Sequence, residues 1–273
     1  MGRPFLKMNG LGNDFVVVET RSQPFTPTAA EVRAIADRQA GVGCDQLIAI
    51  DPVDGADAFV RFWNADGEEV SACGNGTRCV GWLLMQSTGK DRVEVETRAG
   101  RLVATRAGER LVSVDMGEPR LDWREIPLAE AQDTRALDVA LYHHASLMAP
   151  PGAVSMGNPH VVFFVPDIDQ APIAEAGPAV ETHPLFPEHV NVGFAQVKGR
   201  DRIRLRVWER GAGLTKACGT GACAALVAAS RRDLVGRHAT LELDGGELFI
   251  EWADNGHVIM TGPAAVDGTG ELP

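Results

Sequence analysis

The sequence ACGNG at residues 72–76 returns as ACGTG at residues 217–221, a shift of 145 positions along the chain. Further pairs related by the same shift, without a gap, are RFW at 61–63 with RVW at 206–208, GN at 12–13 with GN at 157–158, and Gly117 with Gly262. One short match would be chance, but several matches of glycine, asparagine, tryptophan and cysteine at one offset are better explained by a repeated fold unit. The sequence therefore predicts two pseudo-symmetric domains.

The domain limits follow from the repeat and from the strand patterns within it. Residues 93–115 and 239–260 alternate apolar and polar side chains around turn residues, which predicts antiparallel hairpins in both halves. We expect the first domain at residues 1–118, with a tail at 263–273 that returns to it, and the second domain at residues 119–262.

Helices are expected at matching places in the repeat. Thr28 followed three residues later by Glu31 is typical of a capping box and predicts a helix over residues 29–39. Helix-compatible stretches follow the two glycine-rich motifs, at residues 77–87 and 222–232. The cysteine of each motif is therefore expected just ahead of a helix start.

The composition excludes several classes of protein. The chain is acidic, with 26 Lys and Arg against 37 Asp and Glu, which disfavours nucleic acid as a partner. The longest apolar stretches, such as Val80–Met85 and Ala222–Ala229, are far shorter than the roughly 20 residues that a bilayer requires, so no membrane partner is expected. Met1–Lys7 shows no apolar leader segment, and five cysteines in 273 residues are too few for a disulfide framework. We expect a cytoplasmic protein.

The five cysteines fall into two groups. Only Cys73 and Cys218 are equivalent under the repeat. A thiol at a helix start, among glycines that let backbone N–H groups converge, is expected to be partly ionised to the thiolate. Cys44, Cys79 and Cys223 are interpreted as small buried apolar side chains.

Two other uses of the cysteines stay open at this point. Four thiolates, from Cys73, Cys79, Cys218 and Cys223, would suffice for a zinc ion, although their spacings differ from the usual two-to-four-residue knuckles and two of them break the repeat. A disulfide between Cys73 and Cys218 is chemically allowed, but in a reducing compartment it would reflect oxidation rather than support the fold.

A pair of equivalent acid/base thiols suits the inversion of a carbon stereocentre. One group takes the proton from one face, and its protonated partner delivers a proton to the opposite face. A pyridoxal phosphate cofactor needs a lysine, and none of the four lysines lies in a phosphate-binding pattern, so we expect neither cofactor nor metal. The N–H groups at the two helix starts would then stabilise the charge that develops on a substrate carboxylate.

Seven motifs in order resemble the diaminopimelate epimerase family, and the likeness covers nearly the whole chain. They are MNGLGNDF at 8–15, GVGCDQ at 41–46, FWNADG at 62–67, ACGNGTRC at 72–79, MGNPH at 156–160, NVGF at 191–194, and ERGAG at 209–213 together with ACGTGAC at 217–223. The resemblance implies a cofactor-independent interconversion of LL- and meso-diaminopimelate, on the bacterial route to lysine and a peptidoglycan precursor. It also implies an α/β fold of the α+β type, in which each domain is a curled, mainly antiparallel sheet around a central helix.

The resemblance also implies a set of site residues. Cys73 and Cys218 take the place of the two catalytic bases, and His160 that of a supporting residue. The implied substrate contacts are Asn13, Gln46, Asn64, Gly74, Asn75, Asn158, Asn191, Glu209, Arg210, Gly219 and Thr220. Arg210 suits a carboxylate, Glu209 suits an ammonium group, and the amides suit both kinds of group. A homodimer is usual in the family, although the polar residues 267–273 show no strong pairing pattern.

Two alternative functions remain. The first is another two-cysteine amino-acid racemase of the same fold, for example one that acts on proline, although the many amide and charged contacts favour a substrate with two charged ends. The second is a zinc-stabilised binding module without turnover. Cys44, which lies beside Gln46, adds an oxidation-sensitive position that the family does not require.

Overall fold

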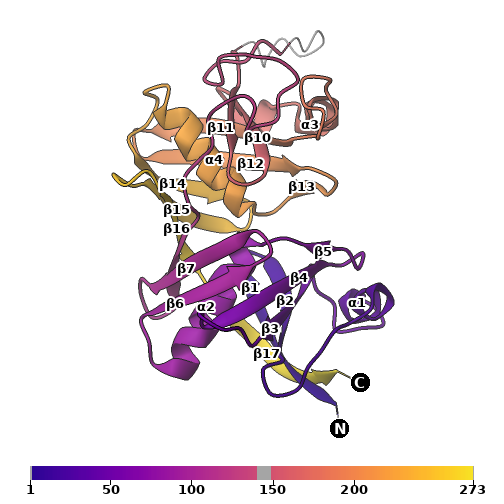
Figure 1. Ribbon diagram of the computed structural model, residues 1–273. Coiled ribbons are helices and arrows are strands. Elements are labelled where there is room, and N and C mark those ends of the chain that lie inside the picture. Colours follow the sequence, from indigo (N-terminus) through magenta and orange to yellow (C-terminus); the bar gives the residue numbers. More distant parts are fainter. Residues whose placement is uncertain (1, 140–148, 273) are drawn as a thin grey trace. The chain divides into compact units, whose positions relative to one another are not determined.

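The computed structural model describes residues 2–139 and 149–272. The chain divides into two compact units, unit 1 with Met1–Asp115 and Thr261–Pro273, and unit 2 with Met116–Met260 (Figure 1). The sequence placed these divisions after residues 118 and 262. Residues 1, 140–148 and 273 of the expected domains lie outside the described residues.

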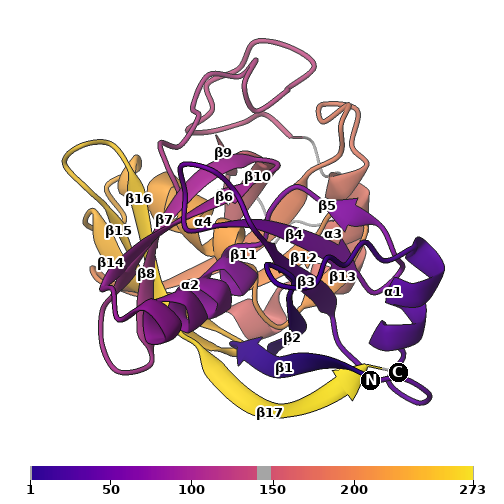
Figure 2. The same ribbon diagram turned by 60° about the horizontal axis from the view of Figure 1, so that its bottom comes forward.

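Unit 1 is a mixed sheet with two helices. Its strands are β1 (Arg3–Gly10), β2 (Asn13–Glu19), β3 (Gln46–Asp51), β4 (Ala58–Asn64), β5 (Glu69–Val70), β6 (Arg92–Thr97), β7 (Gly100–Arg106), β8 (Leu111–Asp115) and β17 (Ala265–Leu272). Most neighbours are antiparallel, and the β2–β3 and β4–β6 pairs are parallel. β17 lies beside β1, so the tail of the chain completes this sheet (Figure 2). The helices are α1 (Ala29–Ala36) and α2 (Gly74–Thr88).

Unit 2 repeats this arrangement. Its elements are β9 (Gly152–Ser155), β10 (Pro159–Phe164), the short 3₁₀-helix η2 (Ile168–Gln170), α3 (Ile173–Glu181), β11 (Asn191–Gly199), β12 (Arg202–Glu209), β13 (Gly213–Thr215), α4 (Gly219–Ser230), β14 (His238–Leu243), β15 (Gly246–Trp252) and β16 (Val258–Pro263), of which the last three residues belong to unit 1. The β10–β11 and β12–β14 pairs are parallel, at the places where unit 1 has β2–β3 and β4–β6.

The offset found in the sequence also relates the elements. β3 begins at Gln46 and β11 at Asn191, while α2 begins at Gly74 and α4 at Gly219, each pair 145 residues apart. The predicted fold class, two related α/β units with mainly antiparallel sheets, is confirmed. The predicted hairpins are confirmed as β6, β7 and β8 in unit 1 and as β14 and β15 in unit 2.

The helices behind the two glycine motifs begin earlier than predicted. We expected them at residues 77 and 222, and they begin at Gly74 and Gly219, because the cysteine before each start caps the helix with its sulfur. In α4 most residues are buried, which its alanine-rich sequence allows because small side chains let neighbouring strands approach from several sides. α2 buries one face against β1, β6, β7 and β8.

The first predicted helix starts where expected and ends earlier. Thr28 and Glu31 form the predicted capping box, with Thr28 N donating to Glu31 Oε2 at 2.7 Å. The helix ends at Ala36 rather than at residue 39. The cause is Asp37, whose carboxylate accepts from the backbone N–H groups of Gln39 and Ala40 and so turns the chain out of the helix.

The strands that carry the site residues of unit 1 are firmly held. The valines of β2 and the apolar residues of β3 are buried, and α1 packs through Val32 and Ala36 against one face of these strands, the face of Val16, Val18, Leu47 and Ala49. Burial of each such side chain contributes roughly 1.5–3 kcal/mol, so the ends of these strands are fixed by the core.

Candidate functional site

Cys73 lies at the N-cap of α2. Its backbone is extended, and its Sγ accepts a hydrogen bond from the backbone N of Gly76 at 3.4 Å. Its Sγ also contacts Asn13 Oδ1 at 3.9 Å, with the thiol as donor. Residue 76 has to be glycine, because a Cβ there would lie 2.8 Å from the Phe62 ring. The start of α2 thus offers the sulfur a backbone donor, and the start of β2 offers it a side-chain acceptor.

Three other predicted contacts of unit 1 lie at neighbouring ends of three strands of its sheet. Asn13 begins β2, Gln46 begins the parallel strand β3, and Asn64 ends the antiparallel strand β4. Gln46 Nε2 donates to Asn64 Oδ1 at 2.8 Å across the strands. Asn75 is buried in the first turn of α2. The topology therefore brings the predicted residues of unit 1 to the strand ends near Asn13, which itself contacts Cys73.

Cys218 repeats the arrangement in unit 2. It is the N-cap of α4, and its Sγ accepts from the backbone N of Gly221 at 3.4 Å. Thr220 Oγ1 lies 3.7 Å from the same sulfur. A Cβ at residue 221 would lie 3.1 Å from Sγ and 3.0 Å from Val207, so a larger residue beside the cysteine would have to displace one of these side chains.

His160, Asn158 and Thr220 form one polar cluster. His160 Nε2 lies 3.0 Å from Thr220 Oγ1 and 3.2 Å from Asn158 Oδ1, and Asn158 Nδ2 donates to Thr220 Oγ1 at 3.3 Å. Burial, aided by the positive charge of Arg210, lowers the pKa of His160 to about 3. The ring is therefore neutral near pH 7 and acts here as a hydrogen-bonding partner of Thr220.

Glu209 lies beside Cys218 at the end of β12. Burial raises the pKa of its carboxyl group, although hydrogen bonds with Thr215 and Cys218 act in the opposite direction. Burial also raises the pKa of Cys218 well above its usual value, and the negative charge of Glu209 adds to that effect. The expectation of a partly ionised thiol is therefore wrong for Cys218 as the structure stands, because these two effects outweigh the hydrogen bonds from Thr220 and Gly221.

Of the remaining predicted contacts of unit 2, Gly219 begins α4, and the side chains of Asn191 and Arg210 are engaged with the backbone. Asn191 is buried, donates from Nδ2 to Pro159 O at 2.9 Å and accepts at Oδ1 from Arg210 N at 3.0 Å. The guanidinium of Arg210 donates to Glu188 O at 2.8 Å. Asn191 therefore holds the loop that carries Arg210, a role that the sequence did not indicate.

The cysteines outside the repeat are buried, as interpreted from the sequence. Burial raises the pKa of Cys44 to about 11 and that of Cys79 to about 12, so both thiols are neutral near pH 7.

Within residues 2–139 and 149–272, no three or more side chains of His, Cys, Asp and Glu come together in a way that could hold a metal ion. No helix in the described part of the chain is long and apolar enough to cross a membrane.

A charged cluster around Asn13 was missed by the sequence analysis. Asp45 Oδ2 accepts from Asn13 Nδ2 at 2.9 Å, and Arg38 binds both Asp45 and Asp14. Burial by itself would raise the pKa of Asp14, but hydrogen bonds from Arg38 and Lys7 outweigh it and hold that pKa well below its usual range. The available signal was the position of Asp14 and Asp45 next to Asn13 and Gln46 within the quoted motifs.

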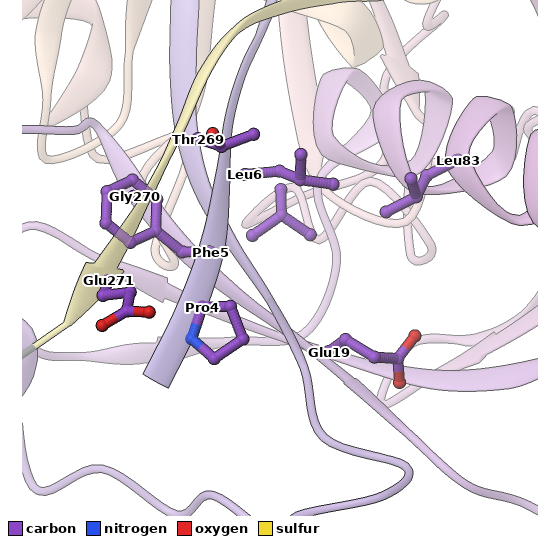
Figure 3. A pocket seen from close by; sticks show the side chains of 9 residues that line it. Pro4, Phe5, Leu6, Glu19, Leu83, Thr269, Gly270 and Glu271 are labelled. Atoms are coloured by element: carbon purple, nitrogen blue, oxygen red, sulfur yellow. The ribbon is translucent and has the colours of Figure 1, made fainter. Parts of the chain in front are cut away.

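A separate pocket of about 410 Å³ lies in unit 1 (Figure 3). Its wall comes from β1, β2, β17 and α2, and it contains none of the predicted site residues. The lining residues are Pro4, Phe5, Leu6, Val17, Glu19, Leu83, Thr269, Gly270 and Glu271.

Comparison with solved structures shows the fold. A hydroxyproline epimerase from Agrobacterium vitis is similar with a TM-score of 0.69 and 18% identity, covering 99% of this chain and 90% of that one. A phenazine biosynthesis protein of the PhzF family from Bacillus anthracis is similar with a TM-score of 0.69 and 15% identity, covering 100% of this chain and 99% of that one. At these identities the likeness concerns the fold alone.

Comparison of sequences is far more specific. The family model for diaminopimelate epimerase matches residues 5–121 and 152–266. The diaminopimelate epimerase of Phenylobacterium zucineum is 85% identical over 273 residues, covering 100% of this chain and 99% of the relative. That of Caulobacter sp. (strain K31) is 60% identical over 288 residues, covering 100% of this chain and 98% of the relative. The chain therefore belongs to the diaminopimelate epimerase family.

Proposed function

We propose that this chain interconverts LL- and meso-diaminopimelate, with Cys73 and Cys218 as the two acid/base groups. The observation that carries the proposal is the repeated cysteine cap: each unit holds one thiol at a helix start, with a backbone N–H at 3.4 Å from its sulfur. Family membership and 85% identity to a relative named diaminopimelate epimerase support the substrate.

In the proposed reaction, a thiolate takes the α-proton of the substrate and the other thiol, protonated, delivers a proton to the opposite face. In the reverse direction the thiols exchange roles. The backbone N–H groups of Gly76 and Gly221 stabilise whichever sulfur is ionised. The carbanion formed in between carries negative charge on the substrate carboxylate, which backbone donors at a helix start are suited to bind.

The polar residues of the two units suit a substrate with two amino-acid ends. Partial burial raises the pKa of the Glu209 carboxyl group, and a substrate ammonium beside it would offset the cost of that burial. The guanidinium of Arg210 is suited to a carboxylate. The rest of the proposed set of contacts is Asn13, Gln46, Asn64, Asn75, Asn158, Asn191 and Thr220, with the backbone of Gly74 and Gly219. Buried donors and acceptors of this kind reject a ligand that lacks the second charged end.

The proposed location is a reducing compartment, the cytoplasm, on the route to lysine and a peptidoglycan precursor. None of the five cysteines, all of which lie within the described residues, forms a disulfide, and the proposed chemistry requires Cys73 and Cys218 in this reduced form. Assembly into a homodimer stays a prediction from the family resemblance.

Hydrogen exchange at the α-carbon tests the substrate. The protein is incubated in D₂O with meso-diaminopimelate and, separately, with L-proline, and deuterium at the α-carbon is followed by NMR and mass spectrometry. We expect deuterium in diaminopimelate and none in proline. Exchange of proline alone would overturn the proposal in favour of a proline-racemase-like activity. Bound zinc together with no exchange of either compound would favour a binding module.

A further inference from the structure

Asp45 lies between Asn13 and the charged cluster of Arg38, Asp14 and Lys7. Its Oδ2 accepts from Asn13 Nδ2 at 2.9 Å and from the backbone N of Asp14 at 3.0 Å. An ionised carboxylate only accepts hydrogen bonds, so the NH₂ end of the Asn13 amide has to face Asp45. The oxygen end then faces the other way, where Oδ1 lies 3.9 Å from the sulfur of Cys73.

The carboxylate of Asp45 is itself held in place. Arg38 Nη2 lies 2.6 Å from Asp45 Oδ1 and 2.8 Å from Asp14 Oδ1. Lys7 Nζ lies 2.6 Å from Asp14 Oδ2, and the backbone N of Asp45 donates to Asp14 O at 3.0 Å. Two cations and a backbone hydrogen bond thus hold Asp14 and Asp45 next to each other. Asn13 is bound to this cluster through Asp45.

The orientation of Asn13 matters for the sulfur. An amide oxygen accepts a hydrogen bond from a thiol and repels a thiolate, whereas an amide NH₂ group favours the thiolate. We infer that Asp45 is a positioning residue, which fixes the Asn13 amide with its oxygen toward Cys73 and thereby favours the protonated thiol at that position.

Among the residues of unit 2 that the structure describes, the same arrangement is not found. The residue 145 positions after Asp45 is Val190, whose side chain cannot accept a hydrogen bond. Asn158, the counterpart of Asn13, binds Thr220 and His160 instead. The inference deepens the proposed function, on which its catalytic meaning rests, because it gives the thiol of Cys73 a tuning contact that differs from those around Cys218.

The test measures the reactivity of Cys73 without any substrate. The rate of alkylation by iodoacetamide, which reacts with the thiolate, is followed for the Cys73 peptide by mass spectrometry from about pH 6 to about pH 10. Asp45→Ala frees the Asn13 amide to turn its NH₂ group to the sulfur. We expect the midpoint of the profile to move to lower pH by about one unit, which gives roughly tenfold more thiolate below the midpoint and, because a less basic thiolate is a weaker nucleophile, a reaction roughly three- to fourfold faster.

Asp45→Asn is the matched control. It removes the negative charge, as Asp45→Ala does, but keeps an oxygen that accepts from Asn13 Nδ2. We expect its profile to stay close to that of the native protein. A profile of Asp45→Ala that coincides with the native one would overturn the inference, and so would an equal shift in Asp45→Asn, since charge rather than orientation would then be the cause.

The same substitution in an Asn13→Ala protein separates an effect on the orientation of Asn13 from a general loosening of the loop that carries Asp45. In Asn13→Ala the oriented oxygen is gone, so adding Asp45→Ala should produce no further shift. A further shift of the same size in that background contradicts the inference. If Asp45→Ala does not fold, Asp45→Leu fills a similar volume without an acceptor and gives the same readouts. Failure of diaminopimelate exchange would count against the proposed function and leave the alkylation result intact.

Discussion

His160 and Glu209 are both held in the interior of unit 2, where burial opposes their charged forms. His160 keeps its hydrogen bonds to Thr220 and Asn158 as a neutral ring. Glu209 places a carboxyl group beside the thiol of Cys218, and burial together with its charge raises the pKa of that thiol. The two halves of the repeat therefore share a backbone geometry and differ in the side chains that tune each cysteine.

The pH dependence of stability tests the burial of His160. Its pKa is about 3 in the folded protein, below the roughly 6.5 of an unfolded chain, so the unfolded state binds the proton more readily. The associated stability is fully present above about pH 6.5 and is lost as the pH falls toward 3. The free energy of unfolding is measured in urea at about pH 7 and at about pH 5. It should therefore fall by more between these two pH values in the native protein than in His160→Gln. Equal losses would contradict this account.

Residues differ in how far the sequence revealed them. Cys73 and Cys218 stood out because the repeat selects them from five cysteines. Asp45 did not, because an aspartate in a glycine-rich loop is usually a turn residue and its contact with Asn13 crosses 32 positions of the chain. The ionisation of Cys218 was predicted in the wrong direction, because the helix start is visible in the sequence and the burial that opposes it is not.

At the scale of elements, α2 and α4 place the cysteines. Both begin directly after a cysteine whose sulfur caps the first turn. The sequence predicted both helices but started them three residues late, because cysteine is not among the usual capping residues. The helix α1 was predicted to run past Asp37, whose carboxylate instead binds two backbone N–H groups beyond the helix end.

The fit of α2 against β7 has a direct test. A Cβ at Gly81 would lie 2.5 Å from Ala104 Cβ, so Gly81→Ala has to push the helix away from the strand. We expect a loss of about 1–3 kcal/mol in the free energy of unfolding, even though alanine favours a helix by up to about 1 kcal/mol. Gly236→Ala, where no atom lies within 4 Å of the added Cβ, is the control and should stay near the native value. A Gly81→Ala protein as stable as the control would contradict this prediction, because α2 and β7 would then move apart at no cost in stability.

At the scale of the whole molecule, the repeat is the organising feature. Strand pairings, helix starts and predicted contacts recur at one offset, so Asn13, Gln46 and Asn64 in unit 1 correspond to Asn158, Asn191 and Glu209 in unit 2. The repeat could be read from the sequence because glycine, cysteine and asparagine persist where the backbone requires them. The change from Asn64 to Glu209 could be read as well, but its consequence for Cys218 depends on the packing around it.

The central proposal is that each unit contributes one thiol to the inversion, one that takes a proton from the substrate and one that delivers a proton to it. It is tested by measuring diaminopimelate epimerisation in Cys73→Ala and in Cys218→Ala, with circular dichroism to show that each variant is folded. The account predicts that each variant keeps its fold and loses activity by at least roughly 10²–10⁴-fold, because inversion needs both an acid and a base. Epimerisation at the native rate in either folded variant would contradict it.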